Sequence, residues 1–88
     1  DLGFSAEEAE HLRVRSVLMI HVQEIIRGRR LRQAQAAKIL GVTQPRISAL
    51  LRGRIDLFST DTLIDMLTRL GARVKLVVKP PRKRLKVA

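Results

Sequence analysis

The sequence contains no cysteine, tryptophan or tyrosine, and it has no long apolar run. Without cysteine, the chain cannot form a disulfide framework or a thiolate metal site. No apolar stretch approaches the roughly 20 residues needed to span a bilayer. The N-terminus also lacks the basic and apolar segments of a secretion signal. We therefore expect a soluble cytoplasmic protein, and 88 residues allow one small domain.

Negatively charged residues are also scarce. Eight aspartates and glutamates oppose eighteen lysines and arginines, which gives a net charge of +10. Thirteen of the eighteen are arginine, whose guanidinium forks onto phosphates and guanine edges. This excess predicts a polyanionic partner, although a basic surface can also serve solubility alone. Single-stranded nucleic acids are usually held by bases stacked on aromatic rings, and Phe4 and Phe58 are the only aromatic residues. Duplex DNA therefore fits better.

Hydrophobic periodicity predicts helices over most of the chain. Four are expected, or five if the first is broken, at about 5–28, 33–40, 43–53 and 59–71. Ser5, Thr43 and Ser59 offer side-chain oxygens that can cap the helices that follow them. A glycine closes each of the last three helices, where a left-handed backbone is accessible to it. The expected fold class is all-α.

After the last helix the pattern takes the period of a β-strand. Val74, Leu76 and Val78 alternate with mostly basic residues. A lone strand needs partners for its backbone hydrogen bonds, and residues 5–71 offer no second strand. The partner is either residues 1–4 or the same strand of a second chain across a two-fold axis. We favour the dimer.

The predicted organisation is a single domain with a short tail. Residues 1–79 comprise the helices and the dimerisation strand. Residues 80–88 are basic, and we expect them to be flexible.

Residues 33–53 have the order helix, tight turn, helix that is typical of motifs that read DNA. Gly41 suits the turn, and Ala36 and Ala37 are small enough for two helices to meet closely. Ile47 belongs to the inner face of the second helix. The N-terminal end of that helix then faces outward, with side chains that can reach base edges.

The segment "LRQAQAAKILGVTQPRISALLRGR" resembles the phage-repressor/Cro (XRE-type) helix-turn-helix family, which implies a lambda-repressor-like fold. It covers about 24 of the 88 residues. The matching landmarks are Leu31, Gln33, Ala37, Leu40, Gly41, Val42, Thr43, Gln44, Ile47, Ser48, Arg52 and Gly53. The whole layout, with a long first helix and a basic strand at the end, also resembles small antitoxin-type regulators of the HigA kind.

The resemblance implies which residues contact DNA. Base reading is expected of Gln44, Pro45, Arg46 and Ala49. Phosphate contacts are expected of Gln33, Thr43, Ser48, Arg52 and Arg54. The family pattern usually has threonine or serine at the cap that Arg32 occupies, and a polar reader where Pro45 stands. No catalytic residue, metal ligand or cofactor is implied.

The triplet Gln44-Pro45-Arg46 suits the entrance of a reading helix. Proline in the first turn sacrifices no intrahelical hydrogen bond and presets the backbone angle. Its ring can rest against a thymine methyl, while Gln44 pairs with adenine and Arg46 with guanine. The alternative for Arg46 is a phosphate contact.

Several other polar residues have two interpretations. Arg27, Arg29 and Arg30 either form a solvated helix end or contact phosphates. His11 and His21 lie on different helix faces with no second ligand at metal spacing, so we favour structural roles for both. The sequence shows no nucleophile–base pair, phosphate-binding glycine loop or paired carboxylates, which argues against an enzyme.

The sequence therefore predicts a sequence-specific regulator that binds double-stranded DNA, as a homodimeric repressor at a palindromic operator. An alternative is an antitoxin that binds its own operator and neutralises a ribonuclease-like toxin protein. A third hypothesis is an interaction module with incidental basic charge. We expect the protein to be associated with the nucleoid, with no membrane or small-molecule partner.

Overall fold

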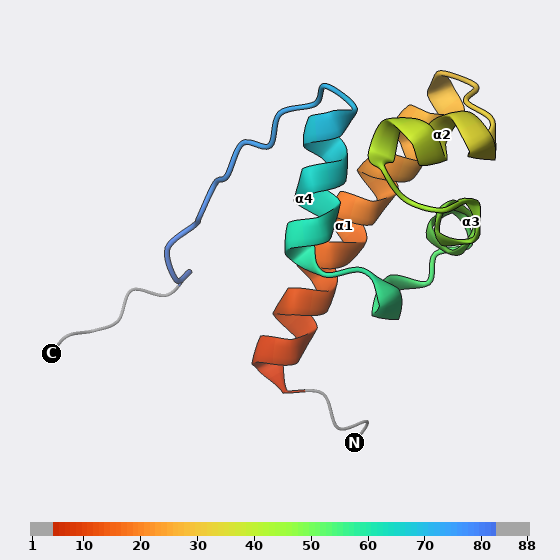
Figure 1. Ribbon diagram of the computed structural model, residues 1–88. Helices are drawn as coiled ribbons and strands as arrows, with labels where there is room; N and C mark the ends of the chain where they lie inside the picture. The colour runs from red at the N-terminus through yellow and green to blue at the C-terminus, as the bar shows by residue number, and fades with distance from the viewer. Residues whose placement is uncertain (1–4, 83–88) are drawn as a thin grey trace, which may run out of the picture.

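The computed structural model describes residues 5–82, which form four α-helices and one 3₁₀ helix (Figure 1). They are α1 (Ala6–Gly28), α2 (Gln33–Leu40), α3 (Gln44–Leu51), η1 (Ile55–Leu57) and α4 (Thr60–Arg69). The predicted all-α class is confirmed, and α1 is one unbroken helix. No helix within the described range is both long enough and apolar enough to cross a membrane.

Helix α1 is the longest element, and α4 lies along it (Figure 1). Its start follows the predicted capping box: the Ser5 hydroxyl accepts from the Glu8 amide at 3.0 Å, and the Glu8 carboxylate accepts from the Ser5 amide at 2.9 Å. The first half of α1 projects past the other helices, and only the second half buries a stripe. The buried residues are Leu18, Met19, Val22 and Ile26.

The core is built from one face of every α-helix. The apolar residues of α2, α3 and α4 recur three or four positions apart, so each helix turns a single stripe inward. Phe58, in the linker between η1 and α4, is the largest fully buried side chain. The other large side chains of the core that are less than 2% exposed are Ile26, Ile47, Leu50, Leu63 and Val22. The helix-turn-helix thus rests directly on the core.

Gly41 ends α2 as predicted, with φ of 69° in the left-handed region. The amide of Val42 donates to the Ala37 carbonyl at 3.0 Å, which closes the turn. A Cβ added at Gly41 would lie 3.2 Å from Nη1 of Arg69, so the exposed Arg69 side chain would have to move slightly, and the left-handed backbone is the main reason for glycine here. Thr43 then caps α3, and its Oγ1 accepts from the Arg46 amide at 3.4 Å.

The predicted C-terminal strand is not formed in the single chain, and this prediction needs correction. Residues 72–82 carry no strand, and beyond α4 they run away from the helices as an open trace (Figure 1). Backbone groups form a strand only where a second extended segment supplies partners. Residues 5–71 supply none, and residues 1–4 lie outside the described range. Val74, Leu76 and Val78 are therefore 42, 84 and 81% exposed.

Replacing Gly41 with alanine should destabilise the fold. The left-handed conformation costs a residue with a Cβ about 1–2 kcal/mol, and we expect that loss in the free energy of unfolding. Gly28→Ala is the matched control, because a Cβ there meets no atom within 4 Å and Gly28 is helical. It should be neutral or stabilising. Equal unfolding free energies for the two variants in urea would contradict this account of the turn.

Candidate nucleic-acid interface

The second helix of the motif is anchored by its inner face. Ile47 and Leu50 of α3 are fully buried. Ala36 and Ala37 are also buried, and they lie on α2, which packs against α3. Small side chains at this contact let the two backbones approach closely. The inner face predicted from the sequence is therefore confirmed, and only the first turn of α3 is left exposed.

Side chains of α1 hold the C-terminal end of α3. Nε2 of Gln23 donates to the Leu50 carbonyl at 2.8 Å, and Nη2 of Arg27 donates to the Leu51 carbonyl at 3.1 Å. The last carbonyls of a helix lack partners within the helix, and a cation there is favourable to the helix dipole. These two contacts fix the position of α3 against α1.

A third contact of this kind closes α4. Nη2 of Arg29 donates to the Leu70 carbonyl at 2.7 Å. The sequence offered phosphate contact or solvation for Arg27 and Arg29, and the structure shows a different role, because both bind carbonyls at helix ends. Gln23 was missed altogether. Its partner lies 27 positions away, so no local pattern marks it.

The N-terminal end of α3 is free. Gln44 and Pro45 are exposed in the first turn, and so is Thr43 before them. Pro45 lies in the first turn, where backbone N–H groups have no acceptor within the helix, so its missing N–H costs no hydrogen bond. The first turn therefore presents one amide side chain and one rigid ring to the surroundings.

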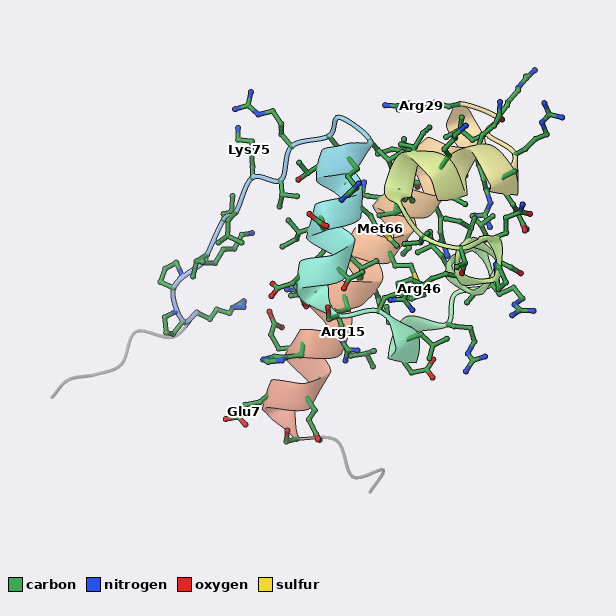
Figure 2. All side chains as sticks on the ribbon, viewed as in Figure 1. Glu7, Arg15, Arg29, Arg46, Met66 and Lys75 are labelled. Carbon is green, nitrogen blue, oxygen red and sulfur yellow. The ribbon has the colours of Figure 1, made fainter. Side chains whose placement is uncertain are left out.

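Arg46 lies differently from its two neighbours. It is half-buried, and its guanidinium carbon lies 4.5 Å from the centroid of the Phe58 ring. Figure 2 shows its side chain on the side of α3 that faces η1 and α4. A guanidinium above an aromatic ring is attracted by the ring's negative face. The stack holds the planar guanidinium in one orientation. Its N–H groups point outward from the edges of that plane, so stacking on the ring does not use them.

The remaining predicted site residues differ in exposure. Ala49 is buried, 7% exposed, so its predicted place on the outer side of α3 was wrong. Ala49 belongs to the same core cluster as its helix neighbours Ile47 and Leu50. Ser48 is half-buried, whereas Gln33 and Arg52 are exposed.

Arg54 is already paired in the free chain. Its Nε and Nη2 each donate to a carboxylate oxygen of Asp56 at 3.3 Å. This hydrogen bonding holds the pKa of the Asp56 carboxyl below its ordinary value. Both side chains remain more than half exposed, and an exposed ion pair of this kind contributes little to stability. Arg54 is therefore available to an external anion.

Charge is distributed unevenly along the chain. Residues 25–55 contain no aspartate or glutamate. Glu7 lies at the projecting end of α1, away from α2 and α3 (Figure 2). The cationic residues of the acid-free stretch are Arg27, Arg29, Arg30, Arg32, Lys38, Arg46, Arg52 and Arg54. Eight positive charges without an intervening negative one favour a polyanion beside the motif.

Two comparisons with known proteins agree with this geometry. A family model described as "Helix-turn-helix domain" matches residues 1–79. A solved structure named "Putative XRE Family Transcriptional Regulator" is similar with a TM-score of 0.79 and 31% sequence identity, over 92% of this chain and 91% of that chain. No curated protein matches the sequence significantly.

Gln23→Leu should lower the free energy of unfolding by about 1 kcal/mol, the net worth of one hydrogen bond. It should also speed amide exchange in α3, because α3 loses one of its two ties to α1. Glu24→Gln is the matched control, since it removes only an exposed contact with His21 at 3.8 Å. Finding Gln23→Leu as stable as Glu24→Gln would show that α1 does not hold α3 in this way.

Proposed function

Because the chain belongs to the XRE-type helix-turn-helix family, we propose that this DNA-binding transcriptional regulator is a repressor that recognises a specific duplex operator through α3. The observation that carries the proposal is the exposed entrance of α3, at Gln44 and Pro45, within the acid-free stretch 25–55. A helix of this kind fits the major groove, where each base pair presents a distinct set of donors and acceptors.

Base reading is assigned to the first turn of α3. Gln44 pairs bidentately with adenine, and the Pro45 ring contacts a thymine methyl. Arg46 pairs with guanine. Its stack over Phe58 is worth about 0.5–2 kcal/mol, whereas a bidentate base contact contributes about 1–3 kcal/mol. A contact with guanine can therefore compensate for the loss of the stack on Phe58, or the Arg46 guanidinium can bind guanine while it remains stacked. Ala49 is left out because it is buried.

Phosphate contacts position the helix in the groove. Arg52 and Gln33 are exposed at the two ends of the motif, and Arg54 follows α3. We assign these three residues, with Thr43 and Ser48, to the DNA backbone. Contacts of this class carry no sequence information, and they make affinity fall as salt rises because bound counterions are released.

The regulator acts as a homodimer in this proposal. One copy of α3 reads only a few base pairs, and two copies read a palindrome when their helices enter successive major grooves, about 34–36 Å apart. We assign the contact between subunits to Val74, Leu76 and Val78, which are exposed in the single chain.

An antitoxin is the second candidate function. Large apolar side chains stand exposed outside α2 and α3: Val17 is 43% exposed, Ile20 49% and Leu57 44%. Apolar surface of this kind suits a protein partner rather than DNA. Co-purification with a small ribonuclease-like protein encoded beside this chain would favour this candidate over a plain repressor.

Arg46→Ala and Arg52→Ala should affect binding in different ways. The operator is first selected from random duplexes with the purified protein, and binding is then followed by fluorescence anisotropy. Arg46→Ala should lose preference at one base position, by a factor on the order of ten, because a base contact is lost. Arg52→Ala should weaken operator and scrambled duplexes alike and reduce the salt slope by about one.

Gln44→Ala serves as a second base-reading variant, since its side chain is exposed in the first turn of α3. Identical behaviour of all three variants on operator and scrambled duplexes would contradict the assigned roles. Urea unfolding of each variant separates a loss of contact from a loss of fold.

A further inference from the structure

We propose that the outer face of α1 is a self-complementary contact, on which a second copy of this chain packs its own α1 in the antiparallel direction. This contact is separate from the one between the two subunits at an operator, and it joins one operator-bound dimer to the next. It rests on the proposed function only in that last respect, because the pairing of two α1 helices needs no DNA.

The outer face of α1 lies opposite its buried stripe. Its residues recur alternately three and four positions apart, which is the spacing of one continuous seam along a helix. In chain order they are Glu10, Arg13, Val17, Ile20, Glu24 and Arg27. All six are exposed in the single chain, and the two apolar ones, Val17 and Ile20, are 43 and 49% exposed. Two neighbouring turns thus present branched apolar side chains to water.

Charge is arranged symmetrically about the apolar centre of the outer face. Arg13 precedes Val17 by four positions, and Glu24 follows Ile20 by four. A half-turn about the centre of the face therefore places Arg13 of one copy opposite Glu24 of the other. The same half-turn sets Val17 against Ile20, so that four apolar side chains meet between two pairs of opposite charges.

The ends of the outer face follow the same rule. Glu10 of one copy lies opposite Arg27 of the other, at both ends of the helix pair. The residues that flank the face carry no formal charge at neutral pH: Val14, Ser16, His21 and Gln23. No like charges are therefore brought together along the antiparallel contact.

The charge pattern selects both the direction and the register of the pair. In a parallel pair each residue of the face lies opposite itself, so that Arg13 meets Arg13 and Glu24 meets Glu24. Like charges across a helix contact are unfavourable. Sliding the antiparallel pair by one heptad sets Val17 against Arg13 or Arg27, which leaves the apolar side chains against charged ones.

The charged groups of the outer face have capacity for a second partner. Nη2 of Arg13 donates to a Glu10 carboxylate oxygen at 2.8 Å, and the two side chains are 64 and 59% exposed. The Glu24 carboxylate lies 3.8 Å from Nδ1 of His21 and its side chain is 67% exposed. A guanidinium has five N–H donors and a carboxylate has about four acceptor sites, so these contacts do not exhaust either group.

The composition of α1 favours a second copy of this chain over DNA as the partner. The helix carries four acidic and three basic residues, whereas the whole chain has a net charge of +10. Half of the acidic residues of the chain lie in α1, so a polyanion gains least there. The charges of the outer face cancel, so two copies of a strongly basic chain meet with least repulsion on this face.

The size of the contact makes it a weak one. Two apolar layers are few beside the interfaces of stable dimers, which bury about 1,200–2,000 Å². A shared duplex raises the effective concentration of the bound copies, so a weak contact suffices there. The outer face of α1 points away from the core on which α3 rests, so pairing leaves the first turn of α3 free for DNA.

Two charge reversals test the pairing without DNA. Arg13→Glu and Glu24→Arg each set like charges against each other in an antiparallel pair, and each should weaken self-association on the order of tenfold. An equimolar mixture of the two variants restores both opposite-charge contacts and should associate as the natural chain does. Glu7→Arg is the matched control for Glu24→Arg, because it changes the charge equally at an exposed position of α1 outside the face.

Self-association is followed by sedimentation equilibrium and by the dependence of amide chemical shifts on protein concentration, up to the millimolar range. The shifts that change should centre on Val17 and Ile20, and circular dichroism verifies that each variant is helical. A mixture that associates no better than either variant alone would overturn the pairing. So would single reversals that associate as well as Glu7→Arg, or α1 shifts that are independent of concentration.

Ile20→Asp tests the apolar centre. It sets a carboxylate against Val17 and should abolish the concentration dependence of the α1 shifts. Ile39→Asp is the matched control, because Ile39 lies on α2 and is 39% exposed. Loss of the concentration dependence in both variants alike, or in neither, would contradict a contact centred on Val17 and Ile20.

Binding to a duplex with two adjacent operators tests the consequence for DNA. The natural chain should fill the two operators cooperatively. Ile20→Asp should lose this cooperativity and keep its affinity for a single operator, whereas Ile20→Leu should keep both. Cooperativity that survives in Ile20→Asp would show that α1 does not join neighbouring dimers.

The outcomes separate this inference from the proposed function. Pairing of α1 in a chain that shows no preference among duplexes would refute the proposed function and leave the pairing. Operator preference without any pairing of α1 would refute the pairing and leave the proposed function. Capture of a different protein on the outer face of α1, in place of a second copy, would refute the pairing and favour the antitoxin.

Discussion

The position of α3 against α1 is the constraint on which the rest of the structure depends. Ile47 and Leu50 hold its inner face in the core, and Gln23 and Arg27 bind its last carbonyls. With one face buried and one end tied, the exposed first turn is the part of α3 left free. A DNA-binding regulator of this family needs that arrangement. If α3 were loosely held, its ordering on DNA would cost conformational entropy and weaken binding.

Charge serves two purposes in this small chain. Arg27 and Arg29 bind helix carbonyls, so part of the basic excess stabilises the fold. The other cations of the stretch 25–55, apart from Arg54 with its partner Asp56, have no acidic residue among them in the sequence, and they favour a polyanion. The acidic residues of α1 lie mainly on its projecting half, apart from the motif (Figure 2). The same separation would orient the protein before contact with a duplex.

Local patterns predicted the parts of the fold that depend on neighbouring residues. Ser5, Thr43 and Ser59 cap helices as expected, because a cap needs only an oxygen and an amide three residues on. The stack of Arg46 on Phe58 was not predictable, since it joins residues from different elements. The burial of Ala49 was missed because family position does not determine local packing. The strand was predicted from the alternation of residues 74–78, but residues 5–71 of the same chain supply no second extended segment with which it can pair.

The central claim is that the first turn of α3 meets duplex DNA while its inner face stays in the core. Amide chemical-shift mapping during titration with the selected operator tests it most directly in a protein of 10.0 kDa. The account predicts the largest changes at Thr43, Gln44 and Arg46 and at the two ends of the motif, with residues 6–16 of α1 unchanged. Changes confined to the projecting half of α1, with α3 silent, would contradict it.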